Sequence, residues 1–237
     1  MINGMFNALS GLRTSAQKLQ NSANNLANVQ TSGFKKNSVT IGEVKSGGSQ
    51  LTSTTRVNIQ GGILPTGNPT DLAINGAGFF QVALPNGGVG FTRTGRFTTN
   101  TDGNMATSDG NEIIPPISIP GNSKGVSINS NGQVSVIVGD ATQIVGQIQL
   151  ANFNNPSELS PQGNNLFTES NSSGAPIASN PGTGGNGTIL SGSLEISNVD
   201  ITEEMLGQIT TQAVFTANAK VIGTADEIIG AILNIKS

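Results

Sequence analysis

The chain has 237 residues and a formal net charge of −3, and only 11% of its residues are charged, against about 25% in typical soluble domains. Cysteine and histidine are both absent, which excludes disulfide bonds, Ser–His and Cys–His nucleophile pairs, and the usual zinc ligands. No apolar run approaches the roughly 20 residues of a membrane-spanning helix, and the N-terminus lacks the basic-then-apolar layout of a signal peptide. We expect no membrane insertion, no nucleic-acid binding and no cleaved signal, and a low-charge surface that suits burial in an assembly.

Residues 2–30 are predicted to form one long helix, because apolar residues recur there at alternating spacings of four and three. The ladder consists of Met5, Leu9, Leu12, Ala16, Leu19, Ala23 and Leu26. A repeat of about 3.5 residues presents one seam to a partner helix, and Gly33 suits the left-handed position after a helix end. The remaining surface is rich in asparagine and serine, which are mediocre helix formers. We therefore expect this helix to be frayed or unfolded in a free subunit and to order when neighbours bury it.

The middle of the chain is poor in helical patterns. Residues 35–75 are polar, with weak strand signals at 39–44 and 56–59, and are interpreted as an extended connecting arm. Residues 76–194 alternate short apolar runs with turn signals, beginning with strands at 79–84 and 90–99, and are predicted to form a β-rich outer domain. Residues 1–34 and 195–237 are assigned to a helical core.

The closing segment is predicted to contain a second long helix that starts after Asp200, a suitable N-cap, with Glu203 completing a capping-box-like pair. Its apolar positions, in a main stripe and a row beside it, are Leu206, Ile209, Ala213, Val221, Ile228 and Ile232, and Phe215, Ile222 and Ile229. The predicted fold class is α+β: the N- and C-terminal helices pair as a coiled-coil-like core, and a β-rich domain of short antiparallel strands intervenes. The apolar positions of both helices are the candidate subunit-interface residues.

The two ends of the chain carry opposite charge. Residues 1–56 hold six basic residues and only Glu43 as an acidic one, a net of +5, whereas residues 195–237 have a net of −4. Complementary charge of this kind sets orientation and encounter more than stability. The alternative interpretation is two independently solvated faces.

Motifs that suggest catalysis or cofactor binding are weak throughout. The glycine pattern at 182–187 matches the dinucleotide fingerprint, but we expect no strand before it and no helix after it, so a loop is the better interpretation. The run Asn100, Asp102 and Asn104 is interpreted as a hairpin turn rather than a calcium loop. Arg93 is interpreted as ion-paired or solvated rather than phosphate-binding. We predict no catalytic, cofactor-binding or metal-binding residues.

Five segments, in order along the chain, resemble signatures of the bacterial flagellar basal-body rod and hook family. They are NNLANVQTSGFK (24–35), GNPTDLAINGAGFFQV (67–82), FTRTGRF (91–97), GSLEISNVD (192–200) and ANAKVI (217–222). The segments GQIQLANFNNP (146–156) and GNNLFTE (163–169) are similar to those of the distal-rod branch of the family. The resemblance covers essentially the whole chain.

This resemblance implies a structural subunit that polymerises into a hollow helical tube, with paired terminal helices inside and the β-rich domain outside. It implies a location in the periplasm-spanning rod, which transmits torque from motor to hook. It also implies export by the flagellar type III apparatus and contact with other copies, other rod and hook subunits and the surrounding ring proteins.

Alternatives remain open at the level of sequence. Residues 36–65 are shorter than in typical distal-rod proteins, Ala213 stands where the family usually has arginine, and Phe215 where it usually has tyrosine, which leaves a proximal-rod or short hook-type subunit possible. Outside the family, the alternatives are an adhesin-like coiled-coil protein and a β-rich carbohydrate-active enzyme. The enzyme would need two carboxylates, from Asp71, Asp102 and Asp109, about 5–9.5 Å apart.

Overall fold

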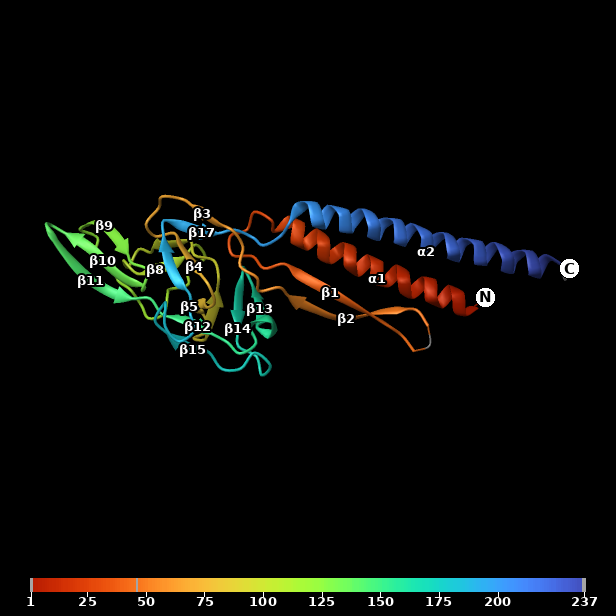
Figure 1. The fold of residues 1–237 in the computed structure, drawn as a ribbon, viewed down its shortest axis with the longest axis horizontal. Helices are drawn as coiled ribbons and strands as arrows, with labels where there is room; N and C mark the ends of the chain where they lie inside the picture. The colour runs from red at the N-terminus through yellow and green to blue at the C-terminus, as the bar shows by residue number, and fades with distance from the viewer. Residues whose placement is uncertain (1, 46, 236–237) are drawn as a thin grey trace. The chain divides into compact units, whose positions relative to one another are not determined.

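The computed structural model describes residues 2–45 and 47–235, and its contacts divide the chain into two units. The helical unit comprises residues 1–29, 36–57 and 199–237, and the β-rich unit comprises residues 30–35 and 58–198. Each unit joins segments that are far apart in the sequence, as the colours of Figure 1 show. Residues 1, 46, 236 and 237, which the predicted terminal helices and arm include, lie outside the described residues.

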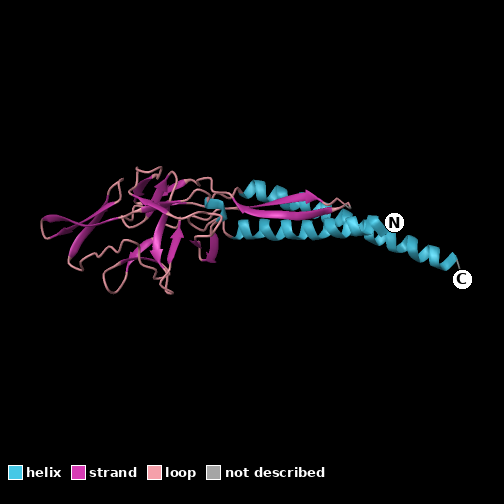
Figure 2. Cartoon of the chain, turned by 90° about the horizontal axis from the view of Figure 1, so that it is seen from below, coloured by secondary structure: helices cyan, strands magenta, loops and turns pink. Residues whose placement is uncertain are grey.

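The helical unit consists of α1 (Ile2–Ala27), α2 (Ile201–Ile235) and a hairpin of β1 (Asn37–Glu43) and β2 (Ser49–Arg56). The two helices pack along each other, which confirms the predicted pairing of the terminal helices within an α+β fold (Figure 1). The hairpin lies along α1, and in Figure 2 its strands run beside the helices. The unit therefore covers α1 from two directions, with α2 and with the hairpin.

The helix boundaries agree with the capping prediction at one end only. Asp200 caps α2, because its Oδ1 accepts hydrogen bonds from the backbone N–H groups of Thr202, at 2.8 Å, and Glu203, at 3.1 Å. The predicted first helix extends to residue 30, whereas α1 ends at Ala27. Gly33 has a positive φ of 70°, but it belongs to the β-rich unit, where an added Cβ would lie 2.6 Å from the Arg93 carbonyl carbon. Close backbone approach, rather than a helix cap, requires glycine there.

The segment expected to be an extended arm contains more regular structure than the sequence suggests. Residues 37–56 form the β1–β2 hairpin, which has a register shift between Thr40 and Ile41. Residues 63–75 supply β3 (Ile63–Pro65) and β4 (Leu72–Asn75) to the β-rich unit. Alternate residues of β2 are half-buried and exposed, so its many threonines and serines form a two-sided strand that weak apolar signals do not reveal.

The β-rich unit is built from antiparallel sheets, as predicted. A six-stranded sheet has the order β13-β14-β6-β5-β12-β15, a three-stranded sheet has the order β11-β10-β9, and two-stranded pairs are formed by β16 with β4, β17 with β3 and β7 with β8. The strands not yet given are β5 (Phe79–Ala83), β6 (Val89–Thr92), β7 (Phe97–Thr99), β8 (Met105–Thr107), β9 (Ser123–Ile128), β10 (Gln133–Val138), β11 (Ala141–Gln147), β12 (Leu150–Asn152), β13 (Ser160–Gly163), β14 (Leu166–Thr168), β15 (Ile177–Ser179), β16 (Thr188–Ser191) and β17 (Ser193–Glu195), with a short 3-10 helix at Pro156–Glu158.

Two apolar clusters hold these sheets together. The larger contains fully buried Phe80, whose ring meets that of Phe97 edge-on at 5.1 Å between centroids. The smaller is largely aromatic, and Phe153 packs edge-on against Phe79 and Phe91 at 5.9 and 4.8 Å. Edge-to-face pairs add to the stabilisation that burial of the rings provides. The well-packed core of the chain therefore lies in the β-rich unit.

The predicted strand at 90–99 is interrupted in the structure. β6 ends at Thr92 and β7 begins at Phe97. Between them, the backbone of Gly95 lies so close to Leu72 that an added Cβ would be 1.6 Å from the Leu72 carbonyl oxygen, while the Leu72 N–H donates to the Gly95 carbonyl at 2.8 Å. A contact with a distant segment therefore breaks the strand, and the local apolar pattern does not show it.

Candidate assembly surface on the terminal helices

The buried face of α1 is made of small and polar side chains. The described residues of α1 that are less than 9% exposed are Ala8, Thr14, Ser15, Ser22 and Asn25. None of them is a large apolar residue, so packing in the helical unit withdraws little apolar surface from water. Hydrogen bonds supply much of the fully buried contact between α1 and its neighbours.

One part of this face contacts the hairpin. The Thr14 and Ser49 hydroxyl oxygens lie 3.0 Å apart, and the Ser49 backbone N–H donates to Ser10 Oγ at 3.1 Å. Farther along α1, the Asn25 amide exchanges two hydrogen bonds with the backbone of Asn37, because Asn25 Oδ1 accepts from Asn37 N and Asn25 Nδ2 donates to Asn37 O, each at 2.9 Å. These contacts fix the hairpin on the polar side of α1.

The other part of this face contacts α2. Glu204 accepts hydrogen bonds from Ser22 Oγ at 2.6 Å and from Asn25 Nδ2 at 2.9 Å. Nearer the start of α1, an added Cβ on Gly11 would lie 2.6 Å from Asn218 Nδ2. Since Gly11 meets Asn218 while Asn25 meets Glu204, the two helices run antiparallel. Lys36 and Glu203 form an ion pair of 2.8 Å beside this contact, so the predicted charge complementarity of the two ends occurs here.

The predicted ladder of α1 lies to one side of the buried face. Leu9 is 38% exposed, and Ala16 and Ala23 are exposed as well. The other four ladder residues, Met5, Leu12, Leu19 and Leu26, are half-buried. Phe6, which is not part of the ladder, is 64% exposed. The ladder is therefore divided: Leu9, Ala16 and Ala23 are exposed on the surface of the helical unit, and the other four residues are half-buried.

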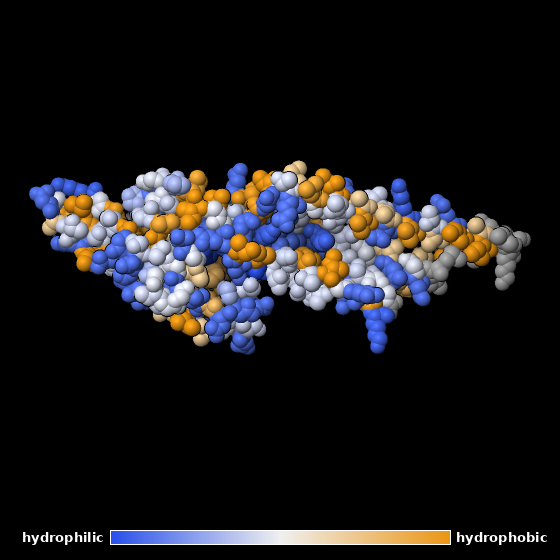
Figure 3. Space-filling model, in the orientation of Figure 1, coloured by the Kyte–Doolittle hydropathy of each residue, from blue (hydrophilic) through white to orange (hydrophobic). Residues whose placement is uncertain are grey.

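The apolar residues of α2 are largely exposed. Nine large apolar side chains are 37–62% exposed, namely Ile201, Met205, Leu206, Ile209, Val214, Phe215, Val221, Ile228 and Ile232. Ala213 is exposed too, while Ile222 and Ile229 are half-buried. Figure 3 shows apolar patches along the part of the molecule where α2 lies. A helix that is apolar around most of its circumference is normally buried on all sides.

The residues of α2 that are half-buried mark its inner face. They are Glu204, Gln208, Thr211, Asn218, Ile222, Ala225 and Ile229, together with a half-buried Gly230. Apart from Gly230, their spacing follows the heptad pattern of a helix that faces one partner. Sequence reasoning identified Ile222 and Ile229, but it missed Ser22, Asn25 and the inward role of Glu204. The one sequence signal for these three residues is that polar side chains occur at heptad positions of both helices.

A buried ion cluster lies in the β-rich unit. Glu195, 1% exposed, accepts from Lys35 Nζ at 2.5 Å and from Arg93 Nε at 2.9 Å. The backbone N–H of Gly61 donates to the same carboxylate at 3.0 Å. Burial lowers the pKa of Lys35 and of Arg93, and the charge of Glu195 opposes this shift in both. The ion-paired interpretation of Arg93 is confirmed, and its partner is a residue that the sequence did not single out.

The other sequence motifs have local structural roles. Residues 100–104 form a turn, in which Gly103 N donates to Asn100 O at 3.0 Å, as expected from the hairpin interpretation. The glycine pattern at 182–187 follows the short strand β15, so the expectation that no strand precedes it was wrong. A strand, β16, and not a helix follows it, which leaves the loop interpretation in place. Asp102 and Asp109 are exposed, whereas Asp71 is 5% exposed.

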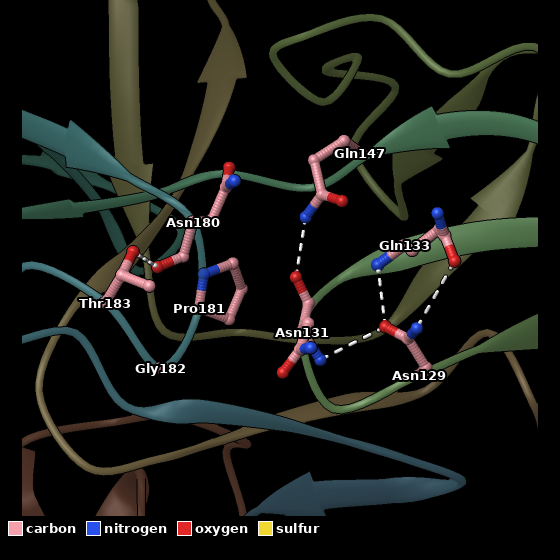
Figure 4. A pocket seen from close by; sticks show the side chains of 8 residues that line it. All are labelled: Asn129, Asn131, Gln133, Gln147, Asn180, Pro181, Gly182 and Thr183. Atoms are coloured by element: carbon pink, nitrogen blue, oxygen red, sulfur yellow. Dashed lines mark hydrogen bonds between the residues drawn. The ribbon is translucent and has the colours of Figure 1, made fainter.

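One pocket of the β-rich unit is lined mainly by amides. It has a volume of about 320 Å³ and is lined by Asn129, Asn131, Gln133, Gln147, Asn180, Pro181, Gly182 and Thr183. Figure 4 shows that several of the amides bond within the wall, for example Gln147 Nε2 to the Asn131 carbonyl at 2.6 Å. Within residues 2–45 and 47–235, no three acidic side chains gather to hold a metal ion, and neither helix has a stretch long and apolar enough to cross a bilayer.

Comparison with known proteins places these features in one family. Residues 73–136 match the family described as flagellar hook protein FlgE/F/G D1 domain, and residues 190–235 match the family described as flagellar basal body rod FlgEFG protein C-terminal. Flagellar basal-body rod protein FlgG of Buchnera aphidicola (from Acyrthosiphon pisum) is 37% identical over 97% of this chain and 98% of its own length. FlgG of Bacillus subtilis is 35% identical over the full length of both chains.

The similarity to hook proteins is partial. The flagellar hook protein FlgE of Escherichia coli is 37% identical, but over only 49% of this chain and 29% of its own length. The similarity to the rod proteins, by contrast, extends through both terminal helices and the β-rich unit. The chain therefore belongs to the FlgG family of flagellar basal-body rod proteins, the structural subunits of the distal rod.

Proposed function

We propose that this chain polymerises with itself into the hollow helical tube of the distal rod and transmits torque from the motor to the hook. Its terminal helices form the assembly surface, and the β-rich unit supplies the outer layer of the tube. Other rod and hook subunits bind the same helical surface at the two ends of the rod. The chain is exported through the flagellar type III apparatus, and its outer layer faces the surrounding ring proteins.

The observation that carries this proposal is the contrast between the two faces of the terminal helices. The fully buried residues of α1 are small and polar, whereas nine large apolar side chains of α2 are left 37–62% exposed. Large apolar surface that is left exposed commonly marks an interaction site. A helical subunit whose apolar residues face outward is therefore incomplete until other subunits cover it.

Burial of these exposed apolar side chains would contribute substantially to assembly. Burying the exposed half of a large apolar side chain contributes a favourable transfer free energy of roughly 1 kcal/mol. Burial of all nine residues of α2 would therefore contribute roughly 10 kcal/mol, before the costs of association are subtracted. The exposed Phe6 and Leu9 of α1 add to this surface. The interface residues proposed here are those of the α1 ladder and of the α2 stripes.

The arrangement also favours an open polymer over a closed dimer. The exposed large apolar residues are spread around α2 and include Phe6 and Leu9 of α1, so one copy offers different patches to different neighbours. Contacts between unlike patches are heterologous, and when the rotation between copies does not close a ring they generate a helical filament. Such a subunit needs no catalytic group, and we infer that the chain is not an enzyme.

Ordering of the helices should accompany assembly. Because the α1–α2 contact buries few apolar groups, the free chain gains little from forming it, while ordering the backbone costs about 1–2 kcal/mol per residue. Neighbouring subunits supply the missing apolar burial. This coupling would keep free subunits from polymerising before they reach the growing end.

Limited proteolysis combined with electron microscopy tests this proposal on the full-length chain. In dilute solution we expect rapid trimming of residues 1–35 and 200–237 and low helix content by circular dichroism. At high concentration we expect tubes, with both segments protected from protease. Protease-resistant terminal helices in a dilute monomer, together with an absence of tubes in concentrated samples, would contradict it.

A further inference from the structure

A polar cluster joins α1, α2 and the hairpin at one point of the helical unit. Its members are Glu204 on α2, Ser22 and Asn25 on α1, and Asn37 at the start of β1. Ser22 is 8% exposed and Asn25 is 1% exposed. Buried polar groups of this kind cost stability unless they are paired, so each contact within the cluster depends on the others.

The Asn25 amide is the centre of this cluster. Its Nδ2 group donates to Glu204 Oε1 and to the Asn37 carbonyl, each at 2.9 Å, and its Oδ1 accepts from the Asn37 backbone N–H. The second oxygen of Glu204 accepts from Ser22 Oγ at 2.6 Å. One amide and one carboxylate therefore tie three chain segments together with directional bonds.

The rest of the helix contact discriminates poorly between alternative registers. Along α1, Ala8, Ser15 and Ser22 repeat every seven residues, so a shift of one heptad places similar small residues opposite α2. Such a shift would bring Glu204 to Ser15 and Lys18 instead of Ser22 and Asn25. The serine would be replaced by a serine, and Glu204 would gain an ion pair with the exposed Lys18, which contributes at most about 1 kcal/mol. The buried Asn25 amide that is fixed by the hairpin would lose its carboxylate, which costs more.

We propose that Glu204, through Asn25, determines the register of the α1–α2 pair. A single polar group in an otherwise permissive helix contact can fix register at some cost in stability. The consequence for the rod rests on the proposed function. A slip of one heptad moves the apolar stripe of α2 about 10 Å along the ladder of α1, since each helical residue rises about 1.5 Å. The composite surface offered to a neighbouring subunit would then no longer match.

Disulfide trapping can measure register directly, because the chain contains no cysteine of its own. The in-register pair is Gly11→Cys with Asn218→Cys: a Cβ at position 11 would lie 3.1 Å from Asn218 Cγ, which brings the two sulfurs within bonding range. The slipped pair is Gly4→Cys with Asn218→Cys. Position 4 lies one heptad away, about 10 Å along α1, and a Cβ there meets nothing within 4 Å. A disulfide between positions 4 and 218 therefore requires the slipped register.

The expected readout is the ratio of in-register to slipped disulfide in assembled full-length protein. With Glu204 present, we expect the in-register disulfide to exceed the slipped one by about tenfold or more. In the Glu204→Leu variant, we expect the two yields to differ by no more than about threefold. The matched control is Glu227→Leu, which removes the same charge from an exposed position of the same helix, and it should leave the ratio unchanged. Glu204→Gln, which keeps one acceptor for Asn25, should give an intermediate ratio.

Two results would overturn the proposal: a ratio near unity in the parent pair of variants, or a ratio that Glu204→Leu does not change. If Glu204→Leu does not assemble, the Glu204→Gln ratio decides the question. If the parent chain forms no tubes, the proposed function fails on that count, and the ratio measured on the concentrated chain still decides whether Glu204 sets the register.

Discussion

Removing the charge of Glu195 should strongly destabilise the β-rich unit. This carboxylate is 1% exposed and lies between Lys35 Nζ, at 2.5 Å, and Arg93, whose Nε and Nη2 nitrogens are 2.9 and 2.8 Å away. Glu195→Gln would keep one acceptor oxygen but turn an N–H₂ donor toward a cation, and it would leave two buried cations without a counter-charge. Breaking a buried pair in this way costs about 3–5 kcal/mol, so we expect the free energy of unfolding to fall by about that amount.

Urea unfolding followed by far-ultraviolet circular dichroism is the suitable assay, because the chain has neither tryptophan nor tyrosine for fluorescence. Glu169→Gln, at an exposed carboxylate of the same unit, is the control and should change stability by no more than about 0.5 kcal/mol. Hydrogen exchange adds a local readout, because the Gly61 N–H donates to the Glu195 side chain. Unfolding free energies of the two variants that agree within about 1 kcal/mol would refute the role of the cluster.

Three further changes test other parts of the β-rich unit. Gly95→Ala forces a Cβ to 1.6 Å from the Leu72 carbonyl oxygen, so it should cost about 3 kcal/mol or more in urea unfolding, and a loss below about 1 kcal/mol would contradict the close approach. Phe80→Ala removes a fully buried ring packed on Phe97 and should cost about 3–5 kcal/mol by the same assay, whereas near-wild-type stability would show that the ring is not part of the core. Burial lowers the pKa of Lys35 below the 10.5 of an unfolded lysine, so near that pH the folded chain binds fewer protons at this residue than the unfolded chain. The contribution of Lys35 to the free energy of unfolding should therefore rise as the pH increases toward 10.5. In Lys35→Met, the urea midpoint should rise less over the same pH range than it does in the parent chain.

The sequence predicts the architecture of this chain well where the signal is local. Apolar residues at heptad spacing predict both helices, and Asp200 predicts the start of α2. Apolar runs between turn residues predict strands such as β5. The break at Gly95 and the hairpin on α1 depend on contacts between distant segments, and a local pattern cannot show them. The same limit explains why the partner of Arg93 was not identified.

The candidate surface was predicted only in part for a related reason. An apolar ladder indicates that a helix has a partner, but it does not say whether that partner is in the same chain. In this chain α2 contacts the polar face of α1 with Ser22 and Asn25, and part of the ladder, including Leu9, stays exposed. Polar residues at heptad spacing contribute to the intramolecular contact, and we propose that the exposed apolar residues serve assembly.

The most direct test of this account is assembly of the purified full-length chain after the exposed face of α2 is made polar. The variant Leu206→Asn with Ile209→Asn changes two side chains that are 59% and 62% exposed, and the control Ile144→Asn changes one that is 67% exposed on β11. Sedimentation and electron microscopy should show tubes for the parent chain and the control, and particles of subunit size for the α2 variant. Tubes of the α2 variant that form as readily as those of the parent would contradict the claim that the terminal helices drive assembly.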